Sequence, residues 1–285
     1  MEALSVFIGL VSHPKSAFAQ GQGPEGLSAQ LALAFDQIGV KTETKVNNVN
    51  FFDDSEFPLT AKMARESVRQ EIRLESEWYH FHKKSEGLAH SIRMAGRLTR
   101  YLLDWRANSK TGELRRLLNI EYSHVDLYRA AVASGSEWAV ILEDDAYSPD
   151  PDGLARGLVQ LMHGPVSPKY INLTTSFPLS KIGIEPLLSV VPQVEWAGSE
   201  QCRVLRSERP ATNTVCAIAF TCEFLSQVLA DFDSYANQPV VPIDWKLNAS
   251  LTRLWETGSI EPGDCWFLEP GPVAQLSMIQ NRTNK

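Results

Sequence analysis

Apolar runs alternate with helical patterns along most of this chain, and together they predict an α/β fold. Leu4 to Val11 is a candidate buried strand, a Gly-rich turn at 21–24 leads into an amphipathic helix through about Ile38, and residues 40–46 alternate like a half-buried strand. Later segments predict helix, strand, strand, helix and helix over 151–162, 169–174, 213–220, 222–232 and 243–256. This order is typical of a mostly parallel sheet flanked by helices.

Residues 61–116 differ from the rest because they are basic, with 13 Lys or Arg against 7 Asp or Glu. Their spacing is helical, and Arg93, Arg97 and Arg100 share one face. One interpretation is a pair of surface helices with solvated faces, and the other is that the arginines meet a phosphorylated ligand or a membrane-bound acceptor. Residues 78–82 (WYHFH) predict a partly buried aromatic cluster, or alternatively an acceptor platform.

Three consecutive acids follow a strongly apolar strand. A helix of about 20 residues through 125–133 ends near Gly135, and 138–142 (WAVIL) then breaks into Glu143-Asp144-Asp145. Ligands of parallel sheets bind beyond the carboxyl ends of the strands. Carboxylates this close repel one another unless a cation compensates, and their oxygens suit Mn²⁺ or Mg²⁺. The alternative is an acidic turn that caps the next helix.

Two other Asp-x-Asp strings occur, at 150–152 and 231–233. Asp150 and Asp152 flank Pro151, which suits a helix cap, and the second string lies at the end of a helical pattern, where positions i and i+2 do not share a face. The position after a buried strand therefore favours 143–145 as the metal site.

Composition narrows the class of protein. The 285 residues are 44% hydrophobic and 21% charged with a formal charge of −7, so we expect a globular protein without a general affinity for nucleic acid, and at most peripheral membrane contact. The apolar N-terminal run lacks the basic flank of a secretory signal, no run reaches a membrane span of about 18 residues, and the four cysteines form no C-x-x-C pair. We expect a cytoplasmic location, and the length suits one large domain or two small ones.

The segment from Ser123-His124 through the helix to SGSEWAVILEDDAY (134–147) resembles glycosyltransferase family 25, which contains lipooligosaccharide and procollagen galactosyltransferases. Shorter segments resemble the family in the same order: 6–12, 213–220, Pro242-Ile-Asp244-Trp245, and Pro270 to Ser277. Residues 47–118 have no clear counterpart in the family.

The resemblance implies a GT-A-type, Rossmann-like single domain, with a nucleotide-sugar-binding half at 1–150 that includes the helical basic segment 61–133, and an acceptor-binding half at 151–285. It also implies metal-dependent, inverting transfer of a hexose from a nucleotide sugar, most often UDP-galactose or UDP-glucose. The acceptor would be a saccharide, a lipid-linked glycan or another hydroxyl compound.

The resemblance assigns roles to residues of this chain. Asp145 would be the main ligand of Mn²⁺ or Mg²⁺ with Glu143 beside it, and Glu143 or Asp144 would contact the donor ribose or a metal-bound water. Residues that would line the nucleotide-sugar pocket are Ser12, His124 and Asn213. For His124 the alternatives are the acceptor pocket or a packed histidine that bonds to the backbone. No histidine follows His163, so Gln275, Ser277 or water would complete the metal shell.

An inverting transfer also needs a base, and a carboxylate near the acceptor hydroxyl is the usual solution. Asp244 is the predicted base because it lies where a loop meets a helix, with an aromatic residue beside it that suits a sugar ring. The alternative is that Asp244 is a helix N-cap.

Two other functions fit the same pattern. One is a metal-dependent sugar nucleotidyltransferase, although the basic, Gly-rich phosphate loop usual in that class is reduced here to Lys15 and a distant 21–23. The other is a non-catalytic GT-A-like binding protein in which the acidic cluster is vestigial.

Overall fold

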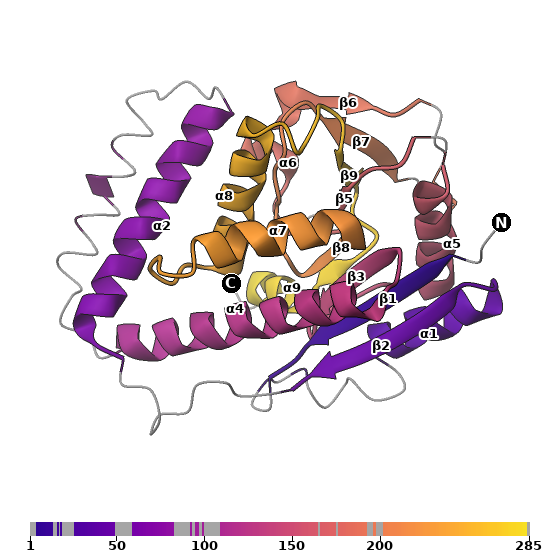
Figure 1. Ribbon diagram of the computed structural model, residues 1–285, viewed down its shortest axis with the longest axis horizontal. Coiled ribbons are helices and arrows are strands. Elements are labelled where there is room, and N and C mark those ends of the chain that lie inside the picture. Colours follow the sequence, from indigo (N-terminus) through magenta and orange to yellow (C-terminus); the bar gives the residue numbers. More distant parts are fainter. Residues whose placement is uncertain are drawn as a thin grey trace.

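The computed structural model describes residues 4–13, 26–48, 59–82, 109–164, 166–174, 176–192 and 202–283, with a few single positions between these ranges. Within them lies an eight-stranded sheet (Figure 1). In spatial order its strands are β2 (Lys41–Asn47), β1 (Ser5–Val11), β3 (Trp138–Glu143), β8 (Ala217–Thr221), β5 (Tyr170–Asn172), β9 (Cys265–Glu269), β7 (Arg203–Ser207) and β6 (Leu188–Val190).

The sheet is mixed, although most of its strands share one direction. β1 is parallel to β2 and β3, and β5 is parallel to β9, whereas β8 and β7 are antiparallel to both of their neighbours. Six of the eight strands therefore run the same way. The α/β prediction is confirmed, and the mostly parallel sheet contains two reversed strands that periodicity did not reveal.

Helices cover both faces of the sheet, as Figure 1 shows. One face carries α1 (Leu27–Gln37) and α5 (Pro151–Met162), and the other carries α4 (Ser109–Ser134), α7 (Cys222–Ser234) and α8 (Ile243–Glu256). Alternation along β1 explains the two layers, because Val6 and Ile8 belong to the first core and Phe7 to the second. Both faces of the strand are buried, and it therefore reads as one continuous apolar run.

Some of the predicted helices and strands have the bounds found in the structure, and others begin or end at different residues. The helices predicted over 151–162 and 243–256 have these bounds, and the N-terminal apolar run is the buried strand β1. The predicted helix before Gly135 is longer, because α4 starts at Ser109. The predicted strand 213–220 begins at Ala217, so Asn213 lies in the preceding loop.

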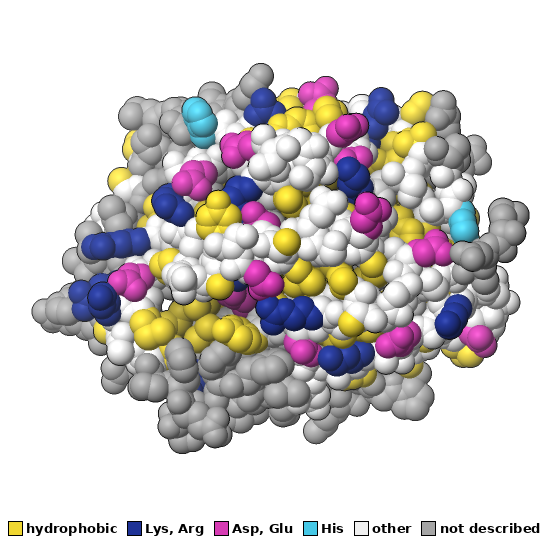
Figure 2. Space-filling model, viewed as in Figure 1, with side chains coloured by type: hydrophobic (Ala, Val, Ile, Leu, Met, Phe, Trp, Pro, Cys, Tyr) yellow, Lys and Arg dark blue, Asp and Glu magenta, His cyan; other side chains and the backbone are white. Residues whose placement is uncertain are grey.

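The basic segment is described only in part. Its first half forms α2 (Ala61–Phe81), which stands at the left edge of Figure 1 and packs against α8 and α4. The arginine stripe of Arg93, Arg97 and Arg100 lies outside the described residues. On the face drawn in Figure 2, basic and acidic side chains of the described residues are interspersed.

No helix in the described part of the chain combines the length and apolar character needed to cross a bilayer. The remaining elements are α6 (Leu179–Ile182), a 3₁₀ turn (Glu185–Leu187), α9 (Leu276–Thr283) and a separate pair of two-residue strands, β4 (Ala146–Tyr147) and β10 (Ala274–Gln275).

Gly9, in the middle of β1, offers a direct test of this packing. A Cβ built there would lie 2.8 Å from Cδ1 of Ile141 on β3 and 3.3 Å from Cδ1 of Leu127 on α4, so an added methyl group would crowd both side chains. We expect Gly9→Ala to lower the free energy of unfolding by about 1–3 kcal/mol through overpacking, measured by urea denaturation. Gly96→Ala is the control, because that Cβ meets no atom within 4 Å. Equal stability of the two variants would contradict the packing account.

Candidate functional site

The candidate site lies at the edge of the sheet where β1 and β3 end. The register pairs Val11 of β1 with Glu143 of β3, so Ser12 and the acidic turn leave the sheet side by side. β8 runs in the opposite direction, and its first residue, Ala217, pairs with Leu142. The loop before β8 therefore reaches the same edge. The structure thus places the acidic segment beyond the carboxyl end of a buried strand, as predicted.

Two short strands hold the acidic turn in place. β3 ends at Glu143, the chain turns, and β4 pairs antiparallel with β10. In addition, the Leu276 N–H donates to the main-chain oxygen of Asp145 at 2.9 Å. A segment more than 120 positions further along the chain therefore fixes the backbone on which the metal-ligand candidates lie.

Asp145 is the most enclosed carboxylate of the turn, with an exposed fraction of 7%. The Ser277 hydroxyl donates to its Oδ2, and the Cys216 thiol lies 3.6 Å from its Oδ1. Burial raises the pKa of Asp145 above its usual range; the hydrogen bond from Ser277 opposes this shift and the negative charge of Glu143 adds to it. Ser277 and Gln275, both proposed from sequence to complete the shell, indeed lie against Asp145.

Glu143, Asp145 and Cys216 place three possible ligand atoms close enough together for one divalent cation. One ligand atom from each of Glu143, Asp145 and Cys216 lies within 4.8 Å of the others. An ion bound at about 2.1 Å keeps opposite ligands about 4.2 Å apart, so a small side-chain rotation suffices. Burial, followed by the neighbouring carboxylates, raises the pKa of the Cys216 thiol well above its usual range. It is therefore protonated at neutral pH, and the two carboxylates remain as hard ligands that suit Mn²⁺ or Mg²⁺.

His124, a predicted pocket residue, supports the acidic turn from α4. Its ring is fully buried, and Nε2 lies 3.3 Å from Glu143 Oε1, where a proton on Nε2 makes a hydrogen bond to the carboxylate. Its Nδ1 is buried and has no hydrogen-bond partner among the described residues. His124 therefore orients Glu143, which no sequence pattern indicated, since 19 residues separate the two.

Asn47 is a site residue that sequence reasoning missed. It is the last residue of β2, is 2% exposed, and its Nδ2 donates to the Ser123 carbonyl at 3.3 Å and to Asp126 at 3.2 Å. Its own carbonyl accepts from the N–H of Ser12, a predicted donor contact, at 2.9 Å. Asn47 thus joins the end of β1 to the start of the His124 segment. The only signal in the sequence is a polar residue that ends an alternating strand.

Asn213, the third predicted pocket residue, lies in the loop before β8. Its Nδ2 donates to the Phe177 carbonyl at 2.6 Å, whereas its Oδ1 is buried and has no hydrogen-bond partner within the described part of the chain. The Oγ1 of Thr174, just beyond β5, is also buried and has no hydrogen-bond partner among the described residues. Nearby, Ser176 donates to Gln275 Oε1 at 2.8 Å. Buried polar groups without partners are uncommon, so the loops after β5 and before β8 hold polar atoms whose hydrogen-bonding capacity is not used by the described residues.

Asp244, the predicted base, is the second residue of α8, and its Oδ1 accepts from the N–H of Trp245 at 2.9 Å. The helix N-cap is Pro242, so the prediction that Asp244 is the N-cap is wrong, although its side chain does accept a first-turn N–H. Burial raises the pKa of Asp244 to about 6; the Trp245 N–H opposes this shift, and the charges of Glu143 and Glu71 add to it. The structure thus brings Asp244 within electrostatic range of the acidic turn.

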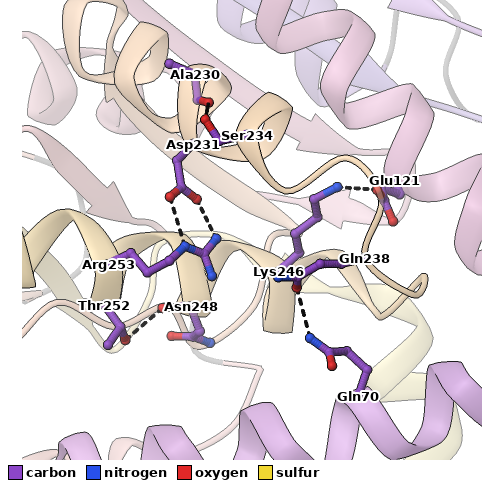
Figure 3. A network of polar contacts seen from close by, with 10 residues as sticks. All are labelled: Gln70, Glu121, Ala230, Asp231, Ser234, Gln238, Lys246, Asn248, Thr252 and Arg253. Carbon is purple, nitrogen blue, oxygen red and sulfur yellow. Dashed lines mark hydrogen bonds and ion pairs between the residues drawn. The ribbon is translucent and has the colours of Figure 1, made fainter.

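The other two Asp-x-Asp strings have structural roles. Asp150 is the N-cap of α5 and accepts a first-turn N–H at 2.9 Å, as predicted. Asp231 binds the guanidinium of Arg253 through two hydrogen bonds (Figure 3), and Asp233 forms an ion pair with Arg129 at 2.8 Å. Neither string offers a carboxylate cluster at a strand end.

A scan of the chain against protein-family models gives no match, and no curated protein matches it. A fold of this kind supports many chemistries, so the function has to be argued from the site.

Proposed function

We propose that this protein is a metal-dependent, inverting glycosyltransferase of the GT-A type, which moves a hexose from UDP-galactose or UDP-glucose to a hydroxyl acceptor. The observation that carries the proposal is a pair of acids suited to a cation at the end of β3, with a third acid, Asp244, near enough for the charge of Glu143 to raise its pKa. Glu143 and Asp145 form a cluster suited to a divalent cation, and Asp244, within electrostatic range, has a pKa of about 6. A metal centre beside a base is what one-step transfer from a nucleotide sugar requires.

Asp145 and Glu143 would hold Mn²⁺ or Mg²⁺, which when bound neutralises the charge of the departing diphosphate. His124 keeps Glu143 directed toward the site through its Nε2 hydrogen bond, and Ser277 does the same for Asp145. The nucleotide sugar would lie against Ser12, Asp144 and the loop of Asn213, whose unpartnered Oδ1 suits a sugar hydroxyl.

Asp244 has the properties of the base. Its Oδ1 accepts from the Trp245 N–H, and Oδ2 is the oxygen that we assign to the acceptor hydroxyl. As the hydroxyl oxygen forms its bond to the anomeric carbon, its proton passes to Asp244, the bond from that carbon to the diphosphate oxygen breaks, and UDP leaves with the electron pair. With a pKa of about 6, Asp244 is ionised at neutral pH and is more basic than an ordinary aspartate.

Thermal unfolding with ligands is the first test. A ligand that binds only the folded protein at 100 times its Kd adds about 2.7 kcal/mol, which for a chain of this size raises Tm by roughly 5 °C. We expect such a shift with UDP or a UDP-hexose only when Mn²⁺ is present. The sugar with the largest shift identifies the donor. No shift with any nucleotide would contradict the proposal and favour a non-catalytic binding protein, whereas pyrophosphate release from a nucleoside triphosphate and a sugar phosphate would indicate a nucleotidyltransferase.

A further inference from the structure

A hollow of about 1100 Å³ lies between α2 and α8. Loops close its ends: Arg209 comes from the loop after β7, and Tyr235 and Gln238 come from the loop after α7. Its volume is slightly above the range of about 300–1,000 Å³ that is usual for ligand sites, and it is partly open to solvent. We call it the α2–α8 groove. It does not include the acidic turn.

Aromatic rings and guanidinium groups form the walls of the groove. Arg209 lies over the ring of Phe81, with its Cζ 5.1 Å from the ring centroid, and Arg253 lies over Tyr235 at 4.1 Å. Asp231 fixes Arg253 from behind through two hydrogen bonds, as Figure 3 shows. Among the described residues Arg209 forms no ion pair, so its N–H donors remain available to a ligand.

Amide side chains add hydrogen-bonding groups to the same groove. Gln238 accepts from Gln70 of α2 at 2.9 Å, which ties the loop after α7 to the opposite wall (Figure 3). Asn248 is held by two hydrogen bonds with the backbone of Thr212. Aromatic surface next to positioned amide and guanidinium donors matches the chemistry of a saccharide, which has apolar ring faces and a rim of hydroxyls.

The groove leads toward Asp244. Asn248, on its floor, is one helical turn after Asp244 along α8. Trp245 packs edge-on against Trp78, a wall residue, with ring centroids 6.2 Å apart. On α2, Glu71 is near enough to raise the pKa of Asp244. The groove and Asp244 therefore share the same stretches of α2 and α8.

We propose that the α2–α8 groove binds an oligosaccharide chain, and that this chain is the acceptor of the transfer proposed above. The second part rests on the proposed function, whereas saccharide binding itself does not. The proposal gives a role to α2, which belongs to the segment without a counterpart in the family that the sequence resembles, and to the aromatic residues at 78–82.

The test is retention on an array of immobilised saccharides of defined structure, followed by calorimetric titration of the best-retained saccharide in solution. We expect the unchanged protein to bind at least one oligosaccharide, and Phe81→Ala, Tyr235→Ala and Arg209→Ala each to weaken its binding by about ten- to a hundredfold. The controls are Tyr122→Ala, an exposed aromatic residue on α4 outside the groove, and Arg203→Ala, an exposed arginine on β7. Neither control should change the affinity.

Two results would overturn the groove proposal: no saccharide on the array retains the protein, or the three groove variants bind as tightly as the controls. The metal-dependent Tm shift with UDP-hexose is measured on the same variants, and we expect it to be unchanged. Loss of saccharide affinity with an intact nucleotide shift supports the groove. Saccharide binding without any nucleotide shift would contradict the transferase and keep the groove as a saccharide-binding site.

Discussion

Asp145→Asn is expected to abolish metal-dependent nucleotide binding and to slow hexose transfer by about 10²–10³-fold, since a metal centre supplies several kcal/mol of stabilisation to the developing charge. The substitution is nearly isosteric, and an amide oxygen still accepts from the Ser277 hydroxyl. It also removes a charge that burial and the neighbouring Glu143 disfavour. The variant should therefore be folded and at least as stable as the unchanged protein without metal.

The matched control for this experiment is Asp150→Asn. Asp150 is another aspartate of an Asp-x-Asp string, but it caps α5, and asparagine caps a helix equally well. Titration with Mn²⁺ by calorimetry, together with single-turnover transfer, measures both variants. If Asp145→Asn keeps the metal-dependent Tm shift with UDP, the acidic turn is not the metal site and the proposed function loses its main support.

Asp244→Asn is expected to lower kcat by about 10²–10⁴-fold, the usual contribution of a general base, with little change in donor affinity. The same substitution is expected to stabilise the folded protein. Because the pKa in the folded protein, about 6, exceeds the ordinary value of 3.8, the ionised side chain reduces the stability of the folded state as pH rises through 6. Removing the charge should raise the free energy of unfolding at pH 7.5 by about 1–3 kcal/mol.

The pH dependence of kcat/KM provides the accompanying test. Activity of the unchanged protein should fall about tenfold per pH unit below pH 6, because a protonated Asp244 cannot accept the hydroxyl proton. Glu71→Gln removes a charge that raises this pKa, and it should move the acid limb to lower pH without changing the maximal rate. If Asp244→Asn is less stable and its kcat is unchanged, Asp244 is not the base, and its role is only to accept the Trp245 N–H in the first turn of α8.

The hydrophobic pattern predicted the elements whose type and bounds are set by residues inside or directly beside them. The bounds of α5 follow from Asp150-Pro151 at its start, and β1 follows from an apolar run buried on both faces. The acidic turn was predictable because three charges directly after WAVIL cannot continue a buried strand. These features depend on residues that are neighbours in the sequence, so one sequence is enough to predict them.

Features that depend on pairing between distant segments were not predictable. Apolar alternation is the same for a parallel and an antiparallel strand, so nothing in 217–221 indicates that β8 runs against β3 and carries Asn213 and Cys216 to the site. The two-residue pairing of β4 with β10 is too short to produce any period. His124 and Glu143, like Asn47 and Ser123, meet only because α4 packs across the sheet.

The pairing of β4 with β10 also bears on how the protein is made. During synthesis the acidic turn leaves the ribosome well before residues 274–277, which give it β-partners and the hydroxyl of Ser277. A nascent chain that already contains β1 and β3 therefore carries the three carboxylates without the clamp that positions Asp145. Under the proposed function, the ability to hold a metal ion and a nucleotide would be acquired late in translation, after almost all of the sheet has been synthesised.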